Sequence, residues 1–222
     1  DPPHLPGPRV PVRAEQPDAP GFDEDLAQIV KGVAMIPGTG EYALSPAGAF
    51  YNDGPGNPWA ANVNHPSGGT DFYASLKGLM GDLPSAETAS LVVSWFGGDL
   101  RCGACDVKPK VESTTIDAST MPWTVSGLPR AAADQIAQQD GRPIYGGTPC
   151  DESVVEAIRH FHLYGRKVTF YPFVLMDQLG GNTLPDPWTG GTGQPALPWR
   201  GRITTSLAPD QLGTPDGTAA AD

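Results

Sequence analysis

The chain has 222 residues, of which 28 are Gly and 25 are Pro, and its formal net charge is −11 at pH 7. This acidic balance disfavours binding to the phosphate backbone of nucleic acids, and no apolar run is long enough to span a bilayer. The Gly and Pro contents exceed average usage and predict many turns and long irregular connections, while 39% hydrophobic residues still supply a core.

Residues 1–32 are predicted to form a proline-rich arm and a short helix. The first 21 residues carry too many prolines for a helix or a central strand. A first residue of Asp suggests that the chain is cut from a longer polypeptide. Residues 22–33 place apolar side chains roughly on one face of a helix. A buried strand is then predicted over residues 33–37, and a turn-rich stretch follows it.

The next predicted unit is a helix over residues 70–80, with Ser67 or Thr70 as its N-cap. This helix is expected to pack against a buried strand over residues 91–96. Residues 97–150 then form a long excursion, which is typical of a functional or docking segment inside a compact domain.

Within the excursion, a short helix is predicted over residues 129–137. A longer amphipathic helix over residues 151–164 follows, and Gly165 is a plausible stop for it. The turn that leads into this helix contains residues 146–149, which lack the lysine of a phosphate-binding loop. A second buried strand is predicted over residues 168–176.

Two buried strands that each end near an aspartate, Asp99 or Asp177, and that are joined through a helix are typical of a (β/α) barrel. The predicted fold class is therefore α/β, a partial TIM-barrel-like domain over residues 33–213, with a polar tail over residues 214–222. A closed barrel of this kind has eight strands, and the sequence supplies only two or three. We therefore expect a fragment of a larger multidomain protein, with an exposed sheet edge that needs contacts beyond this chain.

The three cysteines are Cys102, Cys105 and Cys150. An odd number argues against a disulfide framework, although a local bond between Cys102 and Cys105 is an alternative in an extracellular setting. The spacing of that pair also suits a metal, but too few further ligands accompany it. We predict free thiols in a tight loop, no metal site and no cofactor.

Several longer stretches occur together in one order, namely residues 36–44, 90–103, 140–149, 171–177 and 194–204. They resemble the glycoside-hydrolase TIM-barrel-like domain of the large tail-tip protein of gene transfer agents and of related tailed phages of alphaproteobacteria. The resemblance runs from about Val33 to the C-terminus.

This resemblance implies a structural component of a phage-like tail tip, which helps to build the cell-facing end and contacts cell-surface polysaccharide during DNA delivery. The implied partners are other hub proteins and two further copies in a homotrimer. The implied location is the tail tip of the particle, made in the bacterial cytoplasm and acting at the recipient cell surface. The alternative is an active glycoside hydrolase with catalytic acids outside this chain, because a fold alone does not fix an activity.

Glycosidases need two carboxyl groups about 5 Å or about 6.5–9.5 Å apart. Asp99 and Asp177 are the available carboxylates at strand ends, and no catalytic pair is identifiable from them. Asp99 can instead cap its turn and pair with Arg101. Sugar binding is favoured over hydrolysis, because aromatic faces beside polar groups suit a pyranose ring. The candidate carbohydrate-binding residues are Trp95, Asp99, Arg101, Asp177, Asn182, Trp188, Trp199 and Arg200.

Trp95 is the candidate most consistent with core packing, because it alternates with Val93 along a strand. Trp199 is the best exposed candidate of the tryptophans. Arg200 and Arg202 can bind acidic sugars or neutralise local carboxylates.

Overall fold

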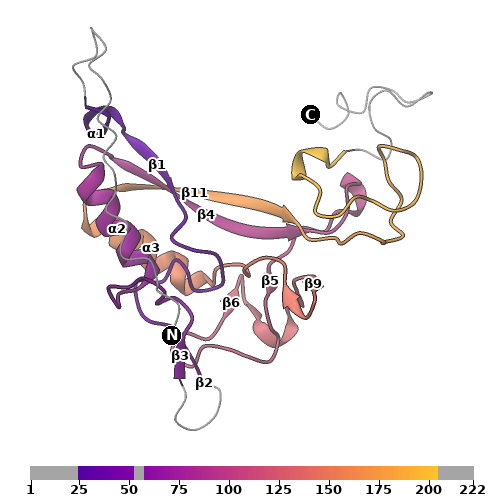
Figure 1. Ribbon diagram of the computed structural model, residues 1–222, viewed down its shortest axis with the longest axis horizontal. Helices are drawn as coiled ribbons and strands as arrows, with labels where there is room; N and C mark the ends of the chain where they lie inside the picture. Colours follow the sequence, from indigo (N-terminus) through magenta and orange to yellow (C-terminus); the bar gives the residue numbers. More distant parts are fainter. Residues whose placement is uncertain (1–24, 53–57, 205–222) are drawn as a thin grey trace, which may run out of the picture.

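The computed structural model describes residues 25–52 and 58–204. The predicted arm over residues 1–21 and the tail over residues 214–222 lie outside the described residues. The described part is mixed α/β, with one parallel sheet of three strands and several two-stranded sheets (Figure 1).

The parallel sheet has the order β1–β4–β11. Its strands are β1 (Gly32–Met35), β4 (Thr88–Gly97) and β11 (Lys167–Met176). The three predicted strands are therefore present, and the two long ones pair over ten residues each, with Val168 opposite Ala89 and Met176 opposite Gly97. The described residues do not form a closed barrel. Of the predicted barrel-like domain, they contain a parallel sheet of three strands.

Two helices cover one face of this sheet, and they lie below it in Figure 1. They are α2 (Asp71–Asp82) and α3 (Asp151–Leu163). Thr70, not Ser67, caps α2, because its Oγ1 accepts a hydrogen bond from the Tyr73 N–H at 3.3 Å. The core between helices and sheet comprises Met35, Leu44, Phe72, Leu76, Ala89, Leu91, Val93, Val154, Ala157 and Phe161.

Two predicted helices are wrong in extent. Helix α1 (Leu26–Ile29) is a single turn within the predicted helix over residues 22–33, because Gly32 already pairs with Thr88 in the sheet. The predicted helix over residues 129–137 is replaced by the 3-10 turn η2 (Arg130–Ala132) and by strand β8 (Asp134–Gln135). Here tertiary contacts override helix propensity, since the Ile136 N–H bonds to the Val111 carbonyl.

The excursion after β4 builds a second lobe from short strands. Its elements are β5 (Lys110–Val111), β6 (Thr124–Val125), β7 (Leu128–Pro129), β9 (Gln138–Gln139) and β10 (Arg142–Pro143), in addition to η2 and β8. The 3-10 turn η1 (Cys102–Ala104) lies apart from this lobe, since the Cys102 N–H donates to the Thr204 carbonyl. The hairpin strands β2 (Phe50–Asn52) and β3 (Pro58–Ala60) pack with this lobe through Tyr51. Its core is centred on the fully buried Trp123, whose Nε1 donates to the Thr148 carbonyl at 2.8 Å.

The face of the parallel sheet opposite the helices carries Val92, Tyr171 and Phe173. Successive side chains of a strand point to opposite faces, and Leu91 and Val93 point toward the helices, so Val92 and its partner Tyr171 point the other way. No described α-helix covers this face, and Tyr171 is 42% exposed. We call it the helix-free face. A hollow of about 250 Å³ lies on it, lined by residues that include Ile36, Val92, Tyr145, Phe173 and Leu175.

The outer edge of β11 is also free in the described part of the chain. The N–H groups of Lys167 and Asp177 both donate toward β4, so even-numbered residues of β11 direct their backbone groups to the outer edge. Pro172 is one of these, and its missing N–H leaves the pairing with β4 intact. Phe170, on the side of the helices, is 51% exposed beside this edge.

No described helix is long and apolar enough to cross a membrane.

Candidate functional site

The predicted carboxylates lie where the parallel strands end, and both are fully engaged. Asp99 follows β4 and is buried. Its Oδ1 accepts from the Arg101 N–H at 2.8 Å, from Arg101 Nε at 3.0 Å and from Gln194 Nε2 at 2.8 Å. Its Oδ2 accepts from Arg101 Nη2 at 2.6 Å. Burial alone would raise the pKa of Asp99, but the hydrogen bonds from Arg101 and Gln194 outweigh it and hold the pKa below its ordinary value.

Asp177 follows β11 and forms a second buried ion pair. Lys110 Nζ lies 2.8 Å from Oδ1 and 2.7 Å from Oδ2, and the Ala137 N–H donates to Oδ2 at 3.1 Å. The side chain of Asp177 is 3% exposed. Lys110 stands on β5, in the excursion that follows β4, and only the folded chain brings it to this strand end.

Each carboxylate thus fastens the loop that follows the other strand. Asp99 on β4 holds Gln194 from the segment after β11, and Asp177 on β11 holds Lys110 and Ala137 from the segment after β4. A glycosidase acid or nucleophile needs a carboxyl oxygen open to substrate. Asp177 lines a hollow together with Lys110 and Asn182, but both carboxylates are held in ion pairs, and their contacts join neighbouring loops.

Asn182 is linked to Asp99 through Gln194, and its side chain forms hydrogen bonds with backbone groups. Its Nδ2 donates to the carbonyls of Leu179 and Gln194, and its Oδ1 accepts from the N–H groups of Leu184 and Gln194. Gln194, which the sequence analysis did not single out, connects the cluster, because its Oε1 accepts from the Leu100 N–H and from Gln178 Nε2. Isolated glutamines carry no spacing signal that would reveal this role.

The predicted tryptophans occupy three different environments. Trp95 is partly buried and packs against both core clusters. Trp188 is half-buried; its Nε1 donates to the Arg202 carbonyl at 2.8 Å, and the Arg202 guanidinium lies 5.1 Å from its ring centroid. Trp199 is 67% exposed and is the one of the three that presents an open ring. The structure therefore does not bring the predicted carbohydrate-binding residues into one site.

Arg200 stands beside Trp199 and reaches back to β11. Its guanidinium carbon lies 4.0 Å from the centroid of the Phe173 ring, and its Nη2 is 3.5 Å from the Tyr171 hydroxyl. The 3-10 turn η3 (Arg200–Arg202) thereby docks on the helix-free face of β11. In Figure 1 it lies above the right-hand ends of β4 and β11.

The three cysteines are free thiols in the structure. Burial raises the pKa values of Cys105 and Cys150, despite hydrogen bonds that favour their thiolates. Cys102 is exposed on η1. Among the described residues, no group of three or more His, Cys, Asp and Glu side chains is arranged to hold a metal ion.

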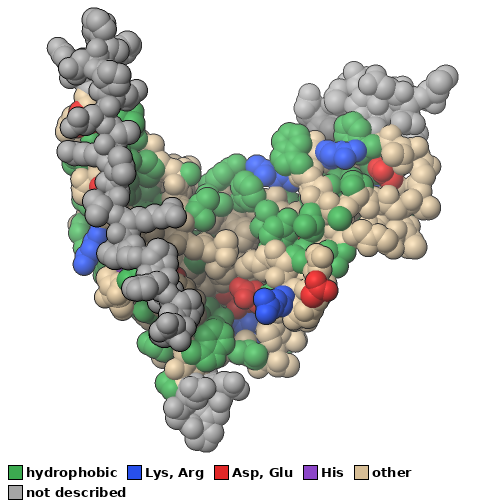
Figure 2. Space-filling view, in the orientation of Figure 1, with side chains coloured by type: hydrophobic (Ala, Val, Ile, Leu, Met, Phe, Trp, Pro, Cys, Tyr) green, Lys and Arg blue, Asp and Glu red, His purple; other side chains and the backbone are tan. Residues whose placement is uncertain are grey.

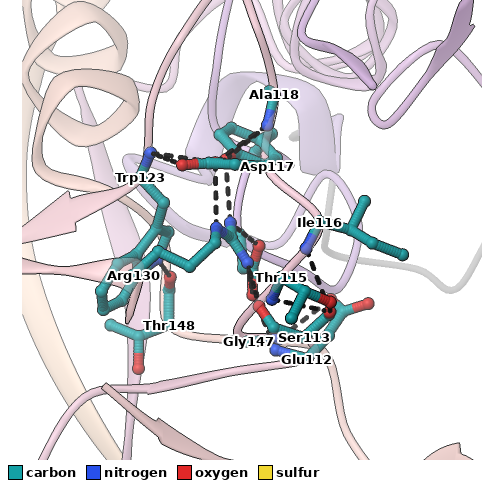
Figure 3. Close-up of polar contacts among 12 residues, drawn as sticks. Glu112, Ser113, Thr115, Ile116, Asp117, Ala118, Trp123, Arg130, Gly147 and Thr148 are labelled. Atoms are coloured by element: carbon teal, nitrogen blue, oxygen red, sulfur yellow. Dashed lines mark hydrogen bonds and ion pairs between the residues drawn. The ribbon is translucent and has the colours of Figure 1, made fainter. Parts of the chain in front are cut away.

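A buried ionic cluster joins the loop after β1 to the excursion (Figure 3). Arg130 pairs with Glu41 through Nη2, lies 2.9 Å from Asp117 Oδ1 through Nε, and donates from Nη1 to the Ser113 carbonyl at 2.6 Å. The Tyr42 hydroxyl accepts from Nη2 at 2.9 Å and donates to Asp117 at 2.5 Å.

The environment of Glu41 is closed to solvent. Burial raises the pKa of Glu41 above its ordinary value, and the charge and hydrogen bond of Arg130 oppose that shift. With its oxygens taken by Arg130 and by the Glu112 N–H, this carboxylate has a structural role. No sequence pattern marks this cluster, because its members are far apart in the chain.

No family model and no curated protein sequence matches this chain.

Proposed function

We propose that this chain is a structural module of a phage-like tail tip, as its resemblance to the tail-tip protein of gene transfer agents implies. In this role it helps to assemble the cell-facing end of the particle, together with hub proteins and further copies of itself, and it contacts polysaccharide at the recipient cell surface. It acts in the particle after synthesis in the bacterial cytoplasm.

The open parallel sheet carries this proposal. The helix-free face exposes Tyr171 and holds an apolar hollow, and the outer edge of β11 is unpaired in the described residues. Parallel sheets are normally covered on both faces, because their strands are apolar on both sides. A module of this shape is suited to an assembly in which neighbouring elements supply the missing cover.

The alternative, an active glycoside hydrolase, has no support in the two strand-end carboxylates. Arg101 and Gln194 occupy Asp99, and Lys110 and Ala137 occupy Asp177.

The test is denaturing mass spectrometry of purified particles, with digestion to peptides. We expect peptides from residues 25–204 to be present at a stoichiometry that matches the tail-tip proteins. Absence of these peptides from intact particles would contradict the structural role. The hydrolase alternative predicts instead that particles release reducing ends from host envelope glycans, and that the release persists in particles with Asp99→Asn and Asp177→Asn.

A further inference from the structure

The indole of Trp199 is exposed and lies against Gly201. It is 67% exposed, yet its ring lies over Gly201, where an added Cβ would stand 2.4–2.6 Å from the ring atoms Cη2, Cζ3 and Cζ2. The absence of a side chain at Gly201 therefore lets one face of the indole rest on the backbone. A large apolar ring presented to solvent in a set orientation is a platform for a flat ligand face.

Arg200 and Arg202, which follow Trp199 closely in the chain, have no carboxylate partner among the described residues. Arg200 stacks on Phe173 and Arg202 stacks on Trp188. Among the described residues, no carboxylate oxygen lies within ion-pair distance of either guanidinium. Stacking orients a guanidinium and leaves N–H donors for an anion.

We propose that the segment Leu197–Arg202 binds an acidic polysaccharide, with Trp199 under a sugar ring and with Arg200 and Arg202 on carboxylates of uronic-acid units. This inference rests on the proposed contact with cell-surface polysaccharide and gives that contact its place and its chemical class. At the upper right of Figure 2, Lys or Arg side chains lie beside hydrophobic ones, with an Asp or Glu side chain nearby.

The chemistry favours a sugar polymer over a nucleic acid. A pyranose ring offers an apolar C–H face for the indole and spaced carboxylates for the two arginines. Nucleic acid carries a denser line of charge, and the net charge of −11 opposes its approach. Single-stranded nucleic acid also stacks on aromatic rings, so it is the competing ligand that the experiment has to include.

The experiment measures binding of the purified chain to polygalacturonate, to neutral dextran and to an oligothymidylate by affinity electrophoresis and calorimetry. We expect binding to polygalacturonate that weakens with salt, and at least about tenfold weaker binding to the other two. Trp199→Ala is expected to weaken polygalacturonate binding about tenfold. The double variant Arg200→Ala with Arg202→Ala is expected to weaken it similarly and to flatten its salt dependence.

Two matched controls and one positional variant sharpen the result. Trp59→Ala removes another half-exposed tryptophan, and Arg159→Ala removes an exposed arginine on α3; neither is expected to change binding. Gly201→Ala keeps Trp199 but displaces its ring, so it is expected to weaken binding in a chain that still folds.

Equal binding of dextran and polygalacturonate, tighter binding of the oligothymidylate, or unchanged binding by Trp199→Ala would each overturn the proposal. The outcome is separable from that of the tail-tip role. A chain that is present in particles but does not bind polygalacturonate removes only this inference. A chain that binds but is absent from particles removes the tail-tip role and leaves the site standing.

Discussion

Arg130 carries its charge inside the protein, where its side chain is 5% exposed. Its charge is balanced there by Glu41 and Asp117, and its Nη atoms donate to oxygens from two separate stretches of the chain. Buried ion pairs contribute little net stability when complete, but removal of one partner leaves an uncompensated charge. The cluster is therefore a point where a single substitution has a large effect.

Arg130→Met is expected to lower the free energy of unfolding by about 3–5 kcal/mol, because it leaves Glu41 buried without its cation. Urea denaturation followed by circular dichroism measures the change. The matched control is the double variant Glu41→Gln with Arg130→Met, which removes both charges and is expected to recover part of the loss. A single variant as stable as the wild type would contradict the structural role of the pair.

The lowered pKa of Asp99 makes the free energy of unfolding depend on pH in the acid range. Burial opposes its charged form, yet the contacts with Arg101 and Gln194 hold its folded-state pKa below the value in the unfolded chain. A depressed pKa contributes stability that is present above about pH 4 and is lost as the pH falls through the folded-state pKa. We expect Asp99→Asn to be less stable than the wild type at neutral pH, and the difference to shrink as the pH is lowered below about 4.

Unfolding titrations of both proteins across this pH range measure the difference. Asp140→Asn is the control, since Asp140 is exposed on the turn between β9 and β10, and it is expected to leave the pH dependence unchanged. A constant difference between Asp99→Asn and wild type at every pH would argue that the ion pair does not set the stability.

At the scale of elements, two glycine-containing loops pack backbone to backbone. A Cβ on Gly146 would stand 2.3 Å from the Gly40 nitrogen, and a Cβ on Gly147 would stand 2.4 Å from the side chain of Glu41. This contact holds the turn before α3 against the loop after β1. It also places Tyr145 and Gly146 beside the hollow on the helix-free face.

Gly146→Ala is expected to lower the free energy of unfolding by about 1–3 kcal/mol or more, because the clash is with backbone that cannot rotate away. Gly103→Ala is the matched control: a Cβ there meets nothing within 4 Å, so its effect is expected to stay small. Thermal unfolding of the two variants under one condition measures the contrast. Equal stabilities would mean that the loops separate more easily than their packing indicates.

For the molecule as a whole, the two faces of the parallel sheet differ in how far their side chains are buried. The face under α2 and α3 buries Leu91 and Val93, whereas the helix-free face leaves Tyr171 half-exposed. Apolar surface of this kind is typical of an interaction surface. Substitutions on the helix-covered face are therefore expected to change the stability of the isolated chain, and substitutions on the helix-free face are expected to change its assembly.

Tyr171→Lys is expected to change the free energy of unfolding by less than about 1 kcal/mol, because the site is partly solvated. The same substitution is expected to reduce self-association and incorporation into particles, since it places a charge on the helix-free face. Sedimentation velocity and particle composition measure the two effects. Leu91→Ala serves as the opposite case, with an expected loss of about 2–5 kcal/mol in stability. Normal incorporation of Tyr171→Lys would contradict an interface at this face.

The sequence by itself determined those strands, caps and helices that are marked by patterns of neighbouring residues. The strand patterns around Leu91 and Val168, the cap at Thr70 and the helix before Gly165 all follow from side-chain periodicity and from capping chemistry. They predicted a parallel α/β sheet, which the structure confirms, and a closed barrel is not present in the described residues.

The tertiary structure decided which distant groups meet. Lys110 reaches Asp177 across 67 positions, Gln194 reaches Asp99 across 95, and Arg130 reaches Glu41 across 89. No spacing rule reveals such pairs, because they arise when loops from different strands converge on one edge of a sheet. The exposure of Trp199 and the partial burial of Trp95 follow what the sequence predicted for these two rings, whereas the distant partners that hold Asp99 and Asp177 at the strand ends meet them only in the folded chain.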